Sequence, residues 1–153
     1  MEPPATLPLA ELLRQVRQSR DYARLTEVIP YTRLLGIGVE DLEGKPRCRM
    51  TYAPELEGRG SVHGGALSGL LESAGFFELL LQEETERVPR LLSFSAEFLR
   101  PGALQDTFAQ AIVTRQGRRM ANLRIEAWQQ ERSRLIATAH AAFQLAPTRT
   151  AQG

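Results

Sequence analysis

Cysteine is nearly absent from this sequence, which contains Cys48 alone in 153 residues. A single cysteine cannot close an intrachain disulfide, and no Cys and His residues stand at zinc-site spacing, so we expect neither a disulfide framework nor a metal site. Lysine is equally rare, because Lys45 is the one lysine among 19 basic residues. The sequence also has 18 acidic residues, so its formal net charge is +1. Nucleic-acid-binding domains usually carry an excess of basic residues. We therefore expect no nucleic-acid partner.

The sequence also lacks an apolar N-terminal stretch typical of a signal peptide. Its longest apolar segment is interrupted by Glu72 and Glu78 before it reaches the ~20 residues of a membrane span. We expect no membrane span and a cytoplasmic location. Otherwise the composition is ordinary, since 42% hydrophobic and 24% charged residues are close to globular averages. A chain of this length is expected to bury one core.

Residues 1–30 are expected to form an N-terminal extension. Prolines predict disorder before Leu9, and from there the apolar residues follow helical spacing. We prefer a helix packed on the edge of the domain, and the alternative is a basic amphipathic helix for a membrane surface or a mitochondrial address. A short second helix is predicted over residues 23–29, ending at Pro30.

After Gly36 the spacing of the apolar residues changes to two, which predicts strands. One strand begins at Ile37, a turn occupies residues 43–46, and a second strand follows. Residues 65–82 are apolar on nearly every face and predict a helix that is buried all round. Four more strands are predicted over residues 92–98, 106–115, 119–128 and 134–145, with Leu92, Phe94, Ala96 and Phe98 on one face.

This order predicts an α+β fold in which an antiparallel sheet wraps around one helix. The main domain is expected to occupy residues 31–146, and residues 147–153 are expected to be a disordered tail.

One short segment points to chemistry. Two glycines follow His63 at the start of the buried helix, and Glu72 stands nine residues after that histidine. Glycines let a ligand approach the backbone closely, and the free N–H groups of a helix N-terminus suit an anion or a polarised carbonyl. A carboxylate within an apolar helix needs partners, or its pKa rises.

Structural interpretations of the same residues stay open. His63 is a possible helix cap, and Glu72 a possible structural carboxylate bonded to Ser68 or to a neighbouring strand. We prefer a functional Glu72 because charges are rarely buried without a reason. Ser73 is a poor candidate nucleophile, since no Gly-x-Ser-x-Gly elbow surrounds it.

The run from His63 to Glu72 resembles the helix signature of the hotdog-fold acyl-CoA thioesterases, in their PaaI-like branch. Residues 31–37 and 98–102 are similar to the same family, and the resemblance covers roughly residues 30–145. It implies a hotdog fold, with an antiparallel sheet around a long central buried helix, preceded here by a helical extension. It also implies an enzyme that hydrolyses acyl-CoA to free acid and CoA without a cofactor. Such enzymes are homodimers that often pair into homotetramers.

The resemblance also implies roles for individual residues. Glu72 takes the position of the catalytic carboxylate, the backbone N–H of Gly65 polarises the thioester carbonyl, and His63 supports the loop. The chain departs from the family at Glu57, six residues before the histidine, where relatives commonly carry Asn or Gln. A second carboxylate there would repel Glu72, raise its pKa or share a proton with it.

Further residues are candidates for substrate binding. Gly64 and Ser68 lie at the helix start, and Phe76 is a candidate wall of the acyl slot, together with Phe77 and Leu80. Cations suit the phosphates of CoA. The candidates are Arg100 and Arg118, with Arg115 and Arg119. The alternative is that these arginines belong to an ordinary solvated surface.

Helix geometry predicts how the site is assembled. Seven residues separate Gly65 from Glu72, which is on the order of 10 Å along the helix axis. An acid and an oxyanion donor must both lie ~3 Å from one reacting centre. Glu72 is therefore expected to serve a carbonyl bound at the helix start of a second subunit, which predicts an obligate homodimer with two composite sites.

Two other functions remain open at this stage. The first is a non-catalytic acyl-CoA-binding hotdog protein, a sensor or scaffold, which Glu57 leaves possible. The second is a hotdog hydratase or dehydratase, which needs a different pairing of acid and histidine. A thiol-release assay separates both from a thioesterase, because only the thioesterase frees CoA steadily.

Overall fold

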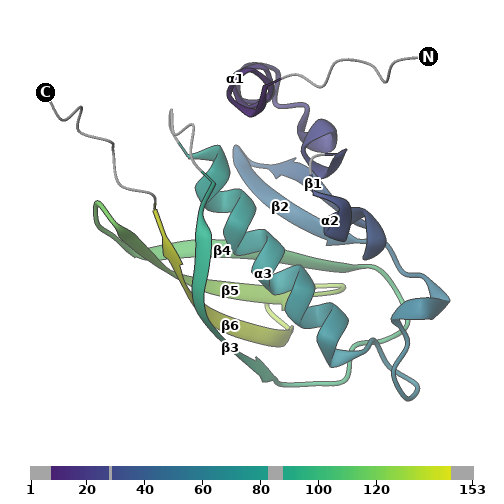
Figure 1. The fold of residues 1–153 in the computed structure, drawn as a ribbon. Coiled ribbons are helices and arrows are strands. Elements are labelled where there is room, and N and C mark those ends of the chain that lie inside the picture. The colour runs from purple at the N-terminus through teal and green to yellow at the C-terminus, as the bar shows by residue number, and fades with distance from the viewer. Residues whose placement is uncertain (1–7, 28, 83–87, 146–153) are drawn as a thin grey trace, which may run out of the picture.

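A six-stranded antiparallel sheet forms the frame of the molecule, with the strand order β1-β2-β4-β5-β6-β3 (Figure 1). The computed structural model describes residues 8–27, 29–82 and 88–145, so the predicted disordered ends, residues 1–7 and 147–153, lie outside the described residues. The sheet curves around the long helix α3 (Gly64–Leu81), which confirms the expected hotdog arrangement. The strands are β1 (Ile37–Leu42), β2 (Lys45–Met50), β3 (Arg90–Phe98), β4 (Thr107–Gln116), β5 (Met120–Trp128) and β6 (Leu135–Gln144).

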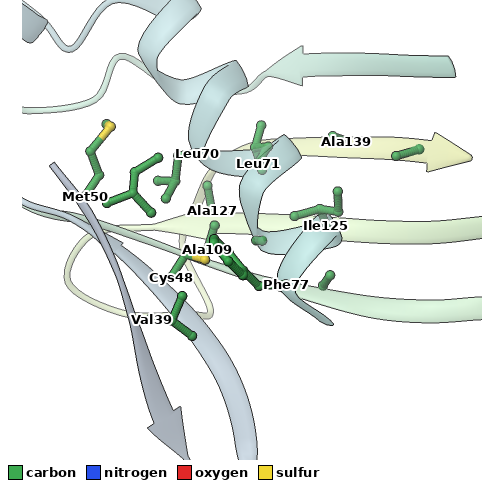
Figure 2. Close-up of a cluster of buried hydrophobic side chains, with 14 of the residues drawn as sticks. Val39, Cys48, Met50, Leu70, Leu71, Phe77, Ala109, Ile125, Ala127 and Ala139 are labelled. Atoms are coloured by element: carbon green, nitrogen blue, oxygen red, sulfur yellow. The ribbon is translucent and has the colours of Figure 1, made fainter. Parts of the chain in front are cut away.

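The core lies between α3 and the concave face of the sheet. Figure 2 shows Leu70, Leu71 and Phe77 of α3, all fully buried, among side chains of five strands. The sheet presents many alanines at this face, and these small side chains let the helix approach closely. Helix α3 is long and apolar enough to cross a membrane, but 61% of it is buried within the fold, as in the core helix of a soluble domain.

The β1–β2 hairpin is tighter than the sequence predicts. Glu43 and Gly44 have φ angles of 51° and 83°, and Leu42 pairs with Lys45 across them. Positive φ at both central residues is typical of a two-residue hairpin turn. Lys45 and Pro46 therefore belong to β2, and the predicted four-residue turn is wrong.

A bulge changes which face of β3 its side chains occupy. The pairing with β6 shifts between Leu91 and Ser93, so that Leu91 faces the core and Leu92 is 53% exposed. A bulge inserts one residue into the alternation of a strand. The predicted apolar face is correct from Phe94 onward but wrong at Leu92.

The N-terminal segment packs against the domain, as the preferred interpretation expects. The amphipathic helix α1 (Leu9–Ser19) buries Leu12, Leu13 and Val16, and Arg17 donates hydrogen bonds to the carbonyls of Leu80 and Gln82 at the C-terminal end of α3. A 3-10 helix, η1 (Tyr22–Glu27), follows. Pro30 does not end a helix but starts α2 (Pro30–Leu34), because proline suits the first turn of a helix, where no N–H is needed.

Candidate active site

The N-terminus of α3 is held by its own cap and leaves one donor open. His63 is the N-cap residue, and its Nδ1 accepts a hydrogen bond of 2.8 Å from the Gly65 N–H. The N–H groups of Ala66 and Leu67 donate to the His63 carbonyl. Among the described residues, no acceptor is bound to the Gly64 N–H. The helix therefore presents an unpaired N–H, at the positive end of its dipole, at Gly64.

Backbone hydrogen bonds fix the loop that carries this cap. The His63 N–H donates to Leu56 at 2.7 Å, and the Val62 N–H donates to the Gly102 carbonyl at 3.0 Å. An isolated bridge pairs Glu57 with Val62, which places Glu57 beside the helix start, where its side chain is exposed. The predicted neighbours Glu57, His63 and the glycines are thus brought together by the structure.

One stripe of α3 stays uncovered along the length of the helix. Most α3 side chains are buried, and the partly exposed ones near the middle of the helix recur at spacings of three and four. Residues at such spacings lie on one helix face. This open stripe consists of Gly65, Ser68, Glu72 and Phe76.

Glu72 has no partner on this stripe. Its carboxylate makes no hydrogen bond or ion pair with any described residue, and burial raises its pKa above the ordinary value. Ser68 Oγ donates to the Gly64 carbonyl at 2.9 Å instead, so the alternative of a Ser68–Glu72 bond is wrong. Ser73 is buried and donates to the Gly69 carbonyl at 2.7 Å, which fits its rejection as a nucleophile.

Aromatic rings flank the open stripe on both sides. On one side, the side chains of Tyr31 and Leu35 reach α3, and a Cβ added at Gly69 would stand 2.7 Å from the Tyr31 hydroxyl and 2.6 Å from Leu35. On the other side, the Phe98 ring lies 3.5 Å from the position of a Cβ at Gly64. Tyr31 and Phe98 are both about half exposed and form the walls of the stripe.

A groove of about 530 Å³ lies beside the segment that holds the loop before α3. Gln129 fixes one wall, because its side chain accepts a hydrogen bond from the N–H of Ala103 and donates one to the Ala103 carbonyl. The residue before Ala103 is Gly102, whose carbonyl accepts the hydrogen bond from Val62. Arg100 and Arg134 line the groove, and neither forms an ion pair with a described residue. The groove is lined by Arg100, Pro101, Ala103, Gln105, Gln129, Gln130, Glu131, Arg134 and Ile136. Its two free cations suit phosphate groups.

The structure separates the two predicted arginine sites. Arg118 lies in the β4–β5 hairpin, whereas the groove of Arg100 adjoins the β5–β6 connection at the other end of β5. Strand β5 has 9 residues and therefore spans about 30 Å. Within one chain, Arg100 and Arg118 do not share a site.

The open Gly64 donor and the Glu72 acid are also apart within one chain. Both belong to α3, where eight residues correspond to about 12 Å of rise. Sequence reasoning missed Tyr31, Phe98 and Arg134 as neighbours of the site. A signal for Tyr31 exists, because a glycine at position 69 of a buried helix indicates a close approach by another element. Within residues 8–27, 29–82 and 88–145, no three His, Cys, Asp or Glu side chains gather as metal ligands do.

An antiparallel sheet around a buried helix, with a capped helix start and an unpaired acid on the open face, defines a thioesterase-type hotdog domain. Residues 53–144, more than half of the chain, match the family model described as the acyl-CoA thioesterase N-terminal domain. The chain therefore belongs to this thioesterase family. A search of curated proteins returned no match.

Solved structures share this fold. A protein from Chromobacterium violaceum is 35% identical, with a TM-score of 0.74 over 89% of this chain and 97% of its own. A phenylacetic acid degradation-related protein from Ralstonia eutropha is 22% identical, with a TM-score of 0.69 over 76% and 90% of the two chains. A thioesterase from Haemophilus influenzae is 21% identical, with a TM-score of 0.69 over 80% and 87%. The last two show the shared fold alone.

Proposed function

We propose that this protein hydrolyses acyl-CoA thioesters to a free acid and CoA, as a cytoplasmic member of the PaaI-like branch. The observation that carries this proposal is Glu72, a half-buried carboxylate without a partner on the open stripe of α3. An unpaired carboxylate with a raised pKa on an open face is typical of a catalytic acid or base. The reaction needs no cofactor, since water supplies the second reactant.

The oxyanion donor that we propose is the backbone N–H of Gly64. The Gly65 N–H, the donor implied by the family resemblance, already donates to His63 Nδ1. The Gly64 N–H is open, and the Phe98 ring lies beside this residue, 3.5 Å from the position of an added Cβ. In this assignment His63 and Gly65 hold the helix start, and Gly64 polarises the thioester carbonyl and stabilises its developing charge.

The active unit that we propose is a homodimer, with a dimer of dimers as the larger assembly. About 12 Å of helix separates Gly64 from Glu72, so the carbonyl at Gly64 of one subunit meets Glu72 of the other across a two-fold axis. Exposed apolar side chains around the open stripe support a covered face. They are Tyr31, Leu34, Phe98 and Leu99.

In the step itself, Glu72 either removes a proton from water as the water attacks the carbonyl carbon, or attacks that carbon directly. The carbon–sulfur bond then breaks, and the sulfur leaves as the CoA thiolate and takes up a proton. In the route of direct attack, water then hydrolyses the acyl–Glu72 anhydride, which releases the free acid and restores the carboxylate. Phe76 lines the acyl slot on the open stripe. Arg100 and Arg134 hold CoA phosphates in the groove that they line. Arg118, in the β4–β5 hairpin, would contact the CoA bound at the site of the partner subunit.

Replacing Glu72 by Gln tests the proposal. We expect kcat/KM for thiol release, measured on a panel of acyl-CoAs, to fall by about 10²–10⁴ because the base is lost. The acid limb of the wild-type profile of kcat/KM against pH is expected above the ordinary glutamate pKa of ~4.3, because burial raises the pKa of Glu72.

Glu78→Gln is the matched control. Glu78 lies on the same helix with a pKa also raised by burial, but it is outside the open stripe, so its variant should keep wild-type rates. Hydrolysis by Glu72→Gln at near wild-type rates would contradict the assigned role.

A non-catalytic acyl-CoA-binding protein is the second candidate, and Glu57 is the observation that favours it. This carboxylate lies beside the helix start, where it would repel an anionic intermediate. Calorimetry that detects acyl-CoA binding, in a sample that releases no thiol from any member of the panel, would support this candidate instead.

A further inference from the structure

We infer that Tyr31 is a positioning residue, whose hydroxyl donates a hydrogen bond to the Glu72 carboxylate of the same subunit. The inference rests on the proposed function, since it concerns how the acid of that site is held. The juxtaposition comes from α2 and α3, which meet where α3 has no side chain, at Gly69.

The first observation is the close approach at Gly69. A Cβ at this position would stand 2.7 Å from the Tyr31 hydroxyl oxygen, so the hydroxyl occupies the space that any other residue would fill. Glycine inside a helix costs about 1 kcal/mol relative to alanine. In this buried helix, glycine at position 69 leaves space for the Tyr31 hydroxyl despite its lower helix propensity.

The second observation is the position of the Tyr31 hydroxyl, beside Gly69, relative to Glu72. Cβ atoms three residues apart on a helix are about 5–6 Å apart, and helical side chains lean toward the helix N-terminus. The Glu72 side chain therefore leans toward the turn that carries Gly69. Its two methylenes let the carboxylate swing across this gap to the Tyr31 hydroxyl.

The third observation is that both groups lack another partner. Neither the Tyr31 hydroxyl nor the Glu72 carboxylate is bonded to a described residue. Tyr31 is 48% exposed, so its hydroxyl stays free to turn toward the open stripe. A phenol that donates to a carboxylate stabilises the ionised form and fixes its direction.

Among the described residues, no charged group contributes to the raised pKa of Glu72. The strands present apolar side chains and the buried Cys48 thiol to α3, and the loop before the helix carries Glu57 and His63. Burial is the sole cause of the raised pKa of Glu72 among the described residues. A hydrogen bond from Tyr31 would act in the opposite direction.

Tyr31→Phe tests the inference in the full-length protein. We expect kcat to fall about ten- to hundredfold while KM changes less than twofold, since one hydrogen bond to a charged group is lost. The acid limb of the profile of kcat against pH should move to higher pH, because the ionised Glu72 carboxylate loses a stabilising hydrogen bond and its pKa rises. The same rise should appear in the Glu72 pKa, measured by carbon-13 NMR of labelled carboxylates.

Two variants keep the result interpretable. Tyr22→Phe removes a hydroxyl on η1 and should change neither the profile nor the Glu72 pKa. Gly69→Ala keeps the tyrosine but displaces its hydroxyl, and should reproduce the effect of Tyr31→Phe.

An unchanged Glu72 pKa in both Tyr31→Phe and Gly69→Ala would overturn the inference. A wild-type protein that releases no thiol would overturn the proposed function instead. The NMR titration still decides the role of Tyr31 in that case.

Discussion

Among single residues, Gly64 combines two properties that seldom occur together. Its N–H is open at the helix start, and it is the first residue of α3, a position that tolerates proline. The preceding residue, His63, already has extended angles of −60° and 136°, which a following proline favours. The proposed donor can therefore be deleted without a helix break.

We expect Gly64→Pro to lower kcat by about 10²–10³, the usual loss for one oxyanion donor. Gly64→Ala is the matched control, because it keeps the N–H and places its Cβ in ordinary contact with Phe98, 3.5 Å away. Its kcat should stay within a few-fold of the wild type. Circular dichroism should show the same helix content in both. Full activity of Gly64→Pro would move the donor role elsewhere.

The spacing in the sequence correctly places His63 at the start of α3 and Glu72 two turns into the same helix. It did not reveal which glycine N–H stays open, since that depends on the direction of the His63 ring. The ring turns to Gly65, and this rotamer is a tertiary property. Tyr31 was missed for a similar reason, because α2 reaches α3 from 38 residues away in the chain.

At the scale of elements, the packing of α3 on the sheet depends on a second glycine, Gly75. A Cβ at this position would stand 3.1 Å from both Ile125 and Phe143, which are 0% and 1% exposed. Neither side chain has space to retreat in a close-packed interior.

We expect Gly75→Ala to lower the free energy of unfolding by about 1–3 kcal/mol through overpacking, despite the better helix propensity of alanine. Urea denaturation followed by circular dichroism measures this change. Gly38→Ala in β1 is the control, since no atom lies within 4 Å of its added Cβ, and its stability should not fall. An equally stable Gly75→Ala would show that α3 is free to shift on the sheet.

Elements whose hydrophobic period is long and regular were predicted almost to the residue. The apolar pattern predicts a helix over residues 65–82, which is found at Gly64–Leu81, and a strand over residues 119–128, which is found at Met120–Trp128. Errors occur at the turn of residues 43–46, at Leu92 and at Pro30. A bulge and a proline at the first position of a helix each reflect local backbone geometry, which the spacing of apolar residues does not encode.

At the scale of the whole molecule, the proposed mechanism assigns to one chain two halves of different sites. The Gly64 donor and the Glu72 acid lie at different heights of α3, and β3 ends the sheet with an unpaired edge. Light scattering should therefore give the mass of a dimer or a tetramer. An active monomer would contradict the composite site.

Mixing two inactive variants tests the composite site most directly. A heterodimer of Glu72→Gln with Gly64→Pro has one site in which the Gly64 of the first subunit faces the Glu72 of the second, and a second site that lacks both groups. Random exchange makes half of the dimers mixed, so about a quarter of the wild-type rate should return. Glu72→Gln mixed with Glu72→Ala should regain nothing, because every site lacks the acid. If native mass spectrometry detects heterodimers and the rate does not recover, donor and acid belong to one chain.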